Sequence, residues 1–326
     1  MSILTINNYT LKHFDLRAKS IMDKYLKFIN VDISDYTFAG NYIWLSTATG
    51  FYIIVNETFC LFILNSGELT MLLPPIGKKE NTYKAMLQCF EIMNTHNSNK
   101  NYSKIEYVHE ELLEGFVDYL EEGTLVYEML KDFLIEKKLV DYIYKADDLI
   151  DLKGDSYKSK RNEVNRFRKV YPNHKIELLD KEKHSKAVLE LFNKWVRDRT
   201  KYMPNEEVEV FMDGIYFERF AMKRLINDYN NLDIIGLVIY IDDELKGFTV
   251  GERINDYTAG VIIEKTDFEI LGCAQFIFRE FTKILKDKYN IEYINVGDDM
   301  GFENLKKVKM SYRPNKLVPK YTIYQK

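Results

Sequence analysis

The sequence is poor in cysteine and histidine. Its three cysteines, Cys60, Cys89 and Cys273, include no C-x-x-C pair, which excludes a disulfide framework and a cysteine-rich zinc site and is typical of a reducing compartment. The five histidines show neither an H-x-x-x-H pattern nor a metal-binding spacing with carboxylates. The sequence therefore predicts no metal site and no tightly bound cofactor.

Glycine, proline and long apolar runs are also scarce. With 15 glycines and 6 prolines, the composition excludes collagen-like and low-complexity proteins. The longest apolar runs, such as residues 236–241, are far shorter than the roughly 20 residues of a membrane-spanning helix. The N-terminus lacks a basic region followed by an apolar stretch, so no signal peptide is predicted. We therefore expect a cytoplasmic protein without a transmembrane segment.

The chain has enough length and apolar content for two cores. It has 326 residues, 46% of them hydrophobic, which favours two domains of roughly 150 residues each. Its net charge is only -4, but residues 153–175 contain eight basic residues against two acidic ones, and residues 304–326 contain seven basic residues and no acidic one. Such basic segments on an acidic protein indicate either an anionic ligand or solvated helix faces.

Hydrophobic periodicity predicts the same order of elements in both halves. In the second half we predict helices over residues 184–201, 206–229, 272–289 and 305–311, and strands over residues 175–179, 232–241, 247–254, 257–263, 291–296 and 317–324. The first half shows the order more faintly, with helices over 11–29, 38–45, 83–93 and 110–121 and strands over 3–7, 51–55, 58–65, 68–73, 105–108 and 140–144. Residues 124–138 are consistent with either a helix or a distorted connector.

This order, β-α-α-β-β-β-α-β-α-β, resembles that of the GCN5-related acetyltransferase (GNAT) fold. The predicted fold class is therefore α/β (α+β), with two tandem GNAT-like domains, each a mixed, mostly antiparallel sheet flanked by helices. We expect the boundary between Lys145 and Asp155, which gives a non-catalytic domain over residues 1–150 and a catalytic domain over residues 151–326.

Three segments carry a closer resemblance: residues 35–44 (DYTFAGNYIW), 148–171 (DLIDLKGDSYKSKRNEVNRFRKVY) and 295–314 (NVGDDMGFENLKKVKMSYRP). Together they resemble bacterial tandem-GNAT proteins related to the C-terminal catalytic domain of phosphatidylglycerol lysyltransferases, the aminoacyl-phosphatidylglycerol synthases. Those synthases transfer an amino acid from its tRNA to phosphatidylglycerol and share their fold with peptidoglycan-bridge aminoacyltransferases. The resemblance implies an acyltransferase whose donor is an aminoacyl-tRNA. Residues 261–267 (VIIEKTD) depart from the synthases' Asp-containing segment, and no flippase half is present in this sequence.

The resemblance and the basic segments select the candidate site residues. Lys309 and Lys320 fall on the synthases' positions for a lysine and a later basic residue that serve the active site, and Arg313 lies between them. Lys309 is our candidate for stabilising a phosphate or an oxyanion. Lys158, Arg161 and Asn165 share one face of a predicted helix that could follow a tRNA acceptor stem or an anionic membrane surface, although a merely solvated helix fits as well.

Carboxylates at predicted strand ends are the candidates for proton transfer. Glu264 and Asp267 end one central strand, where ligands gather in open sheets, and either could act as general base. Asp298 and Asp299 follow the next strand, but the formation of a turn explains them better.

Two alternatives remain open. One is an acetyltransferase that uses acetyl-CoA, whose pyrophosphate would bind at Gly272, Cys273 and Ala274, yet residues 267–274 contain one glycine, no arginine and two acids. Residues 75–79 (PIGKK) in the first half are basic but lack the glycine spacing. The other is a non-enzymatic module that binds tRNA or an anion. A small-molecule acceptor fits either transferase, and a packed thiol fits Cys273 better than a nucleophile.

Overall fold

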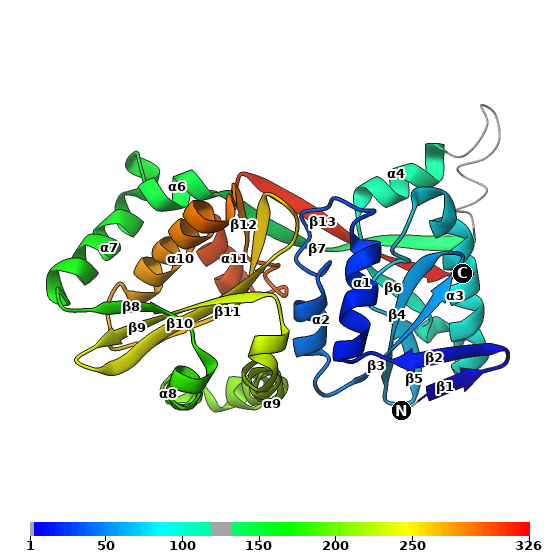
Figure 1. Cartoon of the computed structure of the whole chain (residues 1–326), viewed down its shortest axis with the longest axis horizontal. Helices are drawn as coiled ribbons and strands as arrows, with labels where there is room; N and C mark the ends of the chain where they lie inside the picture. Colours follow the sequence, from blue (N-terminus) through cyan, green and yellow to red (C-terminus); the bar gives the residue numbers. More distant parts are fainter. Residues whose placement is uncertain (1–2, 119–131, 202) are drawn as a thin grey trace. The chain divides into compact units, whose positions relative to one another are not determined.

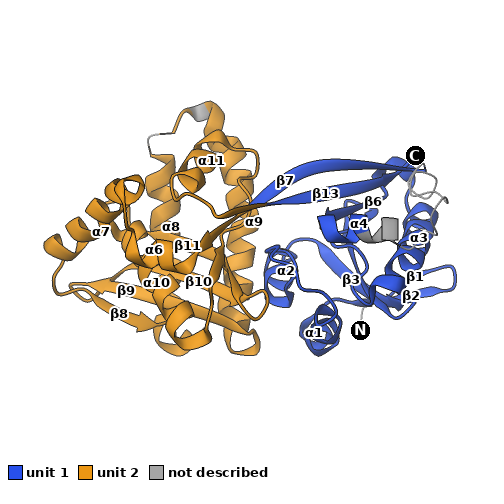
Figure 2. Cartoon of the chain, turned by 90° about the horizontal axis from the view of Figure 1, so that it is seen from above, with its two compact units in different colours: residues 1–141, 318–326 blue, residues 142–317 orange. Residues whose placement is uncertain are grey.

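The computed structural model describes residues 3–118, 132–201 and 203–326. The chain forms two compact units (Figure 2): unit 1 comprises Met1–Asp141 and Val318–Lys326, and unit 2 comprises Tyr142–Leu317. This division differs from the predicted one because the chain passes between the units within two strands, β7 (Phe133–Lys145) and β13 (Lys316–Gln325). The last strand therefore returns to unit 1, and it does not complete the second half.

Unit 1 contains a sheet in the order β1-β2-β3-β4-β5-β6-β13. Its strands are β1 (Ile3–Ile6), β2 (Tyr9–His13), β3 (Thr49–Val55), β4 (Thr58–Asn65), β5 (Glu68–Met71) and β6 (Lys104–Val108). The helices described in it are α1 (Lys19–Leu26), α2 (Phe38–Trp44), α3 (Lys79–His96) and α4 (Glu110–Asp118). Two-residue turns at Asn56-Glu57 and Ser66-Gly67 join β3 to β4 and β4 to β5, and all four residues have the positive φ that such hairpins require.

The prediction of one helix over residues 11–29 was wrong. A turn at Asn7, with φ of 49°, pairs Ile6 with Tyr9 and begins β2, and only the later part of the segment is helical. Residues 133–138 of the undecided segment belong to β7, whereas its residues 124–131 and the predicted helix end at 119–121 lie outside the described residues.

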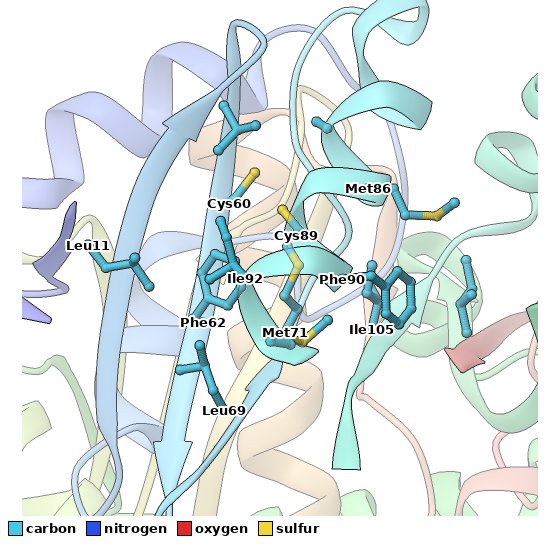
Figure 3. Close-up of a cluster of buried hydrophobic side chains, with 14 of the residues drawn as sticks. Leu11, Cys60, Phe62, Leu69, Met71, Met86, Cys89, Phe90, Ile92 and Ile105 are labelled. Carbon is cyan, nitrogen blue, oxygen red and sulfur yellow. The ribbon is translucent and has the colours of Figure 1, made fainter. Parts of the chain in front are cut away.

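The core of unit 1 lies between its sheet and α3 (Figure 3). Helix α3 contributes Met86, Cys89 and Phe90, which pack against Cys60 and Phe62 of β4. All five side chains are at most 1% exposed. Burial raises the pKa of the Cys89 thiol well above its usual value, so these cysteines are packing residues.

Unit 2 contains a sheet in the order β7-β12-β11-β10-β9-β8. The further strands are β8 (Lys175–Leu178), β9 (Ile234–Ile241), β10 (Glu244–Arg253), β11 (Thr258–Thr266) and β12 (Tyr293–Asn295). The helices described in it are α6 (Ala146–Asp151), α7 (Lys158–Val170), α8 (Lys181–Thr200), α9 (Asn205–Asp228), α10 (Cys273–Tyr289) and α11 (Glu303–Met310). Helix α10 covers one face of the sheet, and α8 and α9 cover the other (Figure 1).

The two units repeat one topology. In each, three consecutive antiparallel strands lead into a long helix, and the next strand pairs in parallel with the third: β6 with β5 in unit 1 and β12 with β11 in unit 2. In unit 2 this parallel pairing extends only over Thr258–Gly260 of β11. The following residues of β11 continue in register with β10 up to Thr266. The strands β11 and β12 therefore separate after Gly260.

Candidate active site

Glu264 lies on β11 beyond the point where β12 separates. It pairs with Thr249 of β10, and its side chain is on the sheet face that α10 covers. Its Oε2 atom is buried and has no hydrogen-bond partner among the described residues. Burial raises the pKa of Glu264 to about 8, and the nearby Thr249 and Lys265 offset only part of this effect. A carboxyl group with a pKa close to neutral can both accept and donate a proton.

Tyr312 lies near both Glu264 and the beginning of α7. Burial, followed by the charge of Glu264, raises the pKa of the Tyr312 hydroxyl. The Lys160 Nζ lies 4.2 Å from the centre of the Tyr312 ring, and the Tyr157 hydroxyl donates a hydrogen bond of 3.0 Å to the Tyr312 carbonyl. Burial lowers the pKa of Lys160. Neither Lys160 nor Tyr312 was a sequence candidate, although both lie in the segments that carry the family resemblance.

The structure brings only some of the predicted binding residues to this region. Lys158 and Arg313 are exposed neighbours of the two hydrogen-bonded tyrosines, so both lie near Tyr312. Arg161 instead donates through Nη1 to the carbonyls of Leu152 and Gly154, and it thereby holds the segment before α7. Asn165 is exposed, about two helical turns beyond Lys158.

Lys309 lies against the loop that follows β12. Its Nζ donates hydrogen bonds to the carbonyls of Val296 (2.6 Å), Gly297 (3.1 Å) and Asp298 (2.5 Å). An ammonium group has three N–H donors, and three carbonyls accept from this one. The same loop is held by a 2.5 Å hydrogen bond from the Tyr142 hydroxyl to Asp299, which lowers the pKa of that carboxyl. Lys309 is therefore placed to position this loop.

Two other predicted residues are engaged in ion pairs. Asp267 is buried and accepts from Lys194 (2.9 Å) and Lys246 (3.3 Å). Burial opposes its ionisation, but the hydrogen bonds and charges of these lysines lower its pKa, which makes it less suited than Glu264 to exchange a proton. Lys320 is buried in unit 1, where it pairs with Asp35 (2.8 Å) and Asp141 (2.9 Å).

Residues 272–274, where the acetyl-CoA alternative would bind the pyrophosphate, lie at the beginning of α10. Gly272 has φ of +80°, and a Cβ atom there would lie 2.3 Å from the Glu163 carbonyl oxygen of α7. Cys273 is fully buried, and burial raises the pKa of its thiol, as the packed-thiol interpretation predicts. Ala274 is half-buried in the first turn. The backbone of α7 therefore approaches the helix end at which a pyrophosphate would bind.

Solved structures share this architecture. A conserved protein of unknown function from Bacteroides thetaiotaomicron has a TM-score of 0.83 at 22% identity, over 97% of this chain and 99% of that one. L-PGS from Bacillus licheniformis has a TM-score of 0.64 at 12% identity, with coverages of 96% and 93%. FemX has a TM-score of 0.62 at 10% identity, with coverages of 100% and 98%. These likenesses confirm the predicted α/β fold of two tandem GNAT-like domains.

The chain belongs to the family described as phosphatidylglycerol lysyltransferase, C-terminal, whose match spans residues 26–324. An uncharacterized protein of Mycoplasmoides gallisepticum is 24% identical over 190 residues, and this match covers 58% of each chain. Family and fold together support a transferase related to the aminoacyltransferases. Within the described residues, the helices lack the combination of length and hydrophobicity needed to cross a bilayer.

Proposed function

We propose that unit 2 transfers an aminoacyl group from an aminoacyl-tRNA to an acceptor hydroxyl, such as that of a phosphatidylglycerol headgroup. The observation that carries this proposal is the Glu264 carboxyl, because its Oε2 atom is buried on β11 beyond the separation from β12 and its pKa is raised to about 8. The family of the chain supports this type of donor and acceptor.

Glu264 would handle the proton of the transfer. The acceptor hydroxyl attacks the ester carbonyl of the aminoacyl-tRNA, and its proton passes to the Glu264 carboxylate. The same proton then passes to the ribose oxygen, which leaves with the tRNA as the ester bond breaks. The carboxylate is regenerated, so the reaction needs no further reactant.

Basic residues near Tyr312 would bind the phosphates of the tRNA acceptor end. Lys158 and Arg313 are exposed there, and Lys160 lies over the Tyr312 ring, which is itself close to Glu264. Cations of this kind supply the salt-dependent part of nucleic-acid binding. Lys309 would act indirectly, since it holds the loop after β12 through three carbonyls.

The acetyl-CoA alternative fits unit 2 less well. The close approach of the Glu163 carbonyl to Gly272 puts a negative partial charge at the beginning of α10, where a pyrophosphate would need free N–H groups. A module that only binds tRNA would use the same basic residues, but it would not need a buried carboxyl with a raised pKa. Glu264 therefore favours the enzyme over the binding module.

The test is single-turnover deacylation of a pool of labelled aminoacyl-tRNAs, with and without vesicles that contain phosphatidylglycerol. We expect loss of one aminoacyl-tRNA and label in the lipid with the wild type. Glu264→Gln should slow this step by roughly 100-fold or more without changing tRNA binding. Glu269→Gln is the control, because that side chain is 77% exposed, and it should retain activity.

Three results would contradict the proposal. Consumption of a coenzyme A thioester in a parallel reaction would identify an acetyltransferase. Binding of tRNA without deacylation by any acceptor would identify a binding module. Full activity of Glu264→Gln would remove the carboxyl from the mechanism.

A further inference from the structure

Strand β10 carries a polar side chain between two glycines where it packs against α10. Thr249 lies two residues after Gly247 and two residues before Gly251. A Cβ atom at Gly247 would lie 3.2 Å from the Cys273 Sγ of α10. One at Gly251 would lie 3.0 Å from the Phe281 ring of the same helix. Since side chains alternate along a strand, Thr249 points to this face of the sheet, and the glycines let α10 pack closely on both sides of it.

The hydroxyl of Thr249 is a buried group whose hydrogen bond is not made. The residue is 0% exposed, and its Oγ1 atom forms no well-aligned hydrogen bond with the described residues. A valine has nearly the same shape without the polar atom, so a threonine at this position costs free energy unless its O–H group is used. The group that uses it should lie beside it in the sheet.

Glu264 lies directly opposite Thr249. The two residues are cross-strand partners in the register of β10 and β11, and both side chains lie on the face that α10 covers. Opposite side chains of an antiparallel pair have Cβ atoms about 4.5–5.5 Å apart. The Oε2 atom of Glu264 is buried and, like the Thr249 Oγ1, has no hydrogen-bond partner among the described residues. A buried donor and a buried acceptor therefore lie side by side, each without a well-formed hydrogen bond.

The other titratable groups around Glu264 act on it differently. Cys273 of α10 and Tyr312 are neutral near pH 8, because burial raises the pKa of each. Lys265 is the next residue on β11, so its side chain leaves from the opposite face, where its Nζ pairs with Glu218 at 2.8 Å. The Thr249 hydroxyl already lowers the pKa of Glu264, which is the direction expected of a donor to the carboxylate form.

We propose that Thr249 is a positioning residue of the candidate active site: its hydroxyl donates a hydrogen bond to the Glu264 carboxylate and fixes the orientation in which this carboxylate receives the acceptor's proton. A carboxylate that forms away from water needs such a donor. The inference rests on the function proposed for Glu264, but the hydrogen bond itself can be detected without any transfer reaction.

The test measures the titration of Glu264 in the full chain by NMR of glutamates labelled at the carboxyl carbon, with Glu264→Gln to identify its signal. Thr249→Val keeps the shape of the side chain and removes the hydroxyl, so the midpoint of this titration should move up by about one pH unit. Thr249→Ser keeps the hydroxyl and should titrate like the wild type. Thr282→Val is the matched control, because Thr282 is also 0% exposed, but its hydroxyl donates to the Phe278 carbonyl within α10 at 2.8 Å.

The transfer reaction gives a second readout that a purely structural role would not produce. Single-turnover transfer by Thr249→Val should be roughly tenfold slower at pH 7, because a carboxyl whose midpoint is about one unit higher is ionised about one tenth as often. Thr249→Ser should restore the rate. If the wild type transfers no aminoacyl group, the proposed function fails, and the titration still decides whether the hydrogen bond exists.

Several results would overturn the proposal. The hydrogen bond is excluded if Thr249→Val leaves the Glu264 midpoint unchanged, or if Thr282→Val moves it by the same amount. A shift in Thr249→Ser as large as that in Thr249→Val would assign the effect to the lost methyl group. Unchanged transfer at pH 7 by a Thr249→Val protein whose midpoint has moved would remove the positioning role. Thr249→Ala lacks the same hydroxyl and takes the place of Thr249→Val if that variant does not fold.

Discussion

Replacing Glu264 by glutamine should stabilise unit 2 at alkaline pH. The pKa of this carboxyl is about 8 in the folded protein, against 4.5 for an exposed glutamate. Below pH 4.5 both states are protonated and burial costs no ionisation energy. As the pH rises, the unfolded chain loses its proton first, so the folded state loses stability until the pH passes the folded pKa. The full difference between these two pKa values corresponds to a loss of roughly 5 kcal/mol in the free energy of unfolding.

This value is an upper limit, because the residue is only partly removed from solvent. Glutamine has nearly the same shape and cannot ionise, so it removes this penalty and keeps the packing. We therefore expect the variant and the wild type to be equally stable near pH 4, and the variant to be more stable by several kcal/mol near pH 9. The gain in stability with a loss of transfer would be the trade-off expected of a functional residue.

The assay is guanidinium unfolding followed by tryptophan fluorescence. The chain has two tryptophans, Trp44 in unit 1 and Trp195 in unit 2, so a Trp44→Phe background makes the signal specific for unit 2. Glu269→Gln in the same background provides the control, because an exposed carboxyl should change stability little at either pH. Equal stability of Glu264→Gln and wild type near pH 9 would refute the idea that a buried charge forms there.

Other substitutions test the contacts that hold each unit. Gly272→Ala should cost about 2 kcal/mol or more, seen as a lower Tm of unit 2, because alanine disfavours this positive φ and its Cβ would collide with the α7 backbone. An unchanged Tm would argue against the close approach of α7 to Gly272. Lys320→Met leaves the buried Asp141 carboxylate and the half-buried Asp35 carboxylate without their ammonium and should cost about 3 kcal/mol in denaturant unfolding of unit 1; a stable variant would contradict the ion-pair assignment. Lys309→Ala should reduce transfer because the loop after β12 loses three hydrogen bonds, whereas unchanged turnover would remove Lys309 from the site.

Local sequence patterns predicted most strands and helices because the elements carry their own signals. The β3–β4–β5 meander follows from short apolar runs and from turns whose residues adopt positive φ. Residues 11–29 misled the prediction, since Leu11, Phe14, Ala18 and Met22 have helical spacing and are all buried. Their burial comes from a strand, a loop and a helix in turn, which the spacing alone cannot distinguish.

The candidate site could be predicted only in part, because its chemistry depends on distant partners. Glu264 and Asp267 are three residues apart and both end a strand, so the sequence treats them alike. Their pKa values shift in opposite directions because Lys194 and Lys246, 73 and 21 residues away from Asp267, reach that carboxylate, whereas Oε2 of Glu264 has no such partner among the described residues. Lys309 was predicted as a cation for a ligand because a charge run does not reveal which backbone carbonyls will accept from it.

The repeated topology allows the two units to be compared at one equivalent feature, the beginning of the helix that follows the third strand. In unit 2 this is α10, where Gly272 permits the α7 backbone to approach and an added Cβ would collide with Glu163. In unit 1 it is α3, whose first turn instead lines a cavity beside His109. The Glu163 carbonyl disfavours an anion at the beginning of α10. The same position of one topology is therefore closed by a neighbouring backbone in unit 2 and open to a cavity in unit 1.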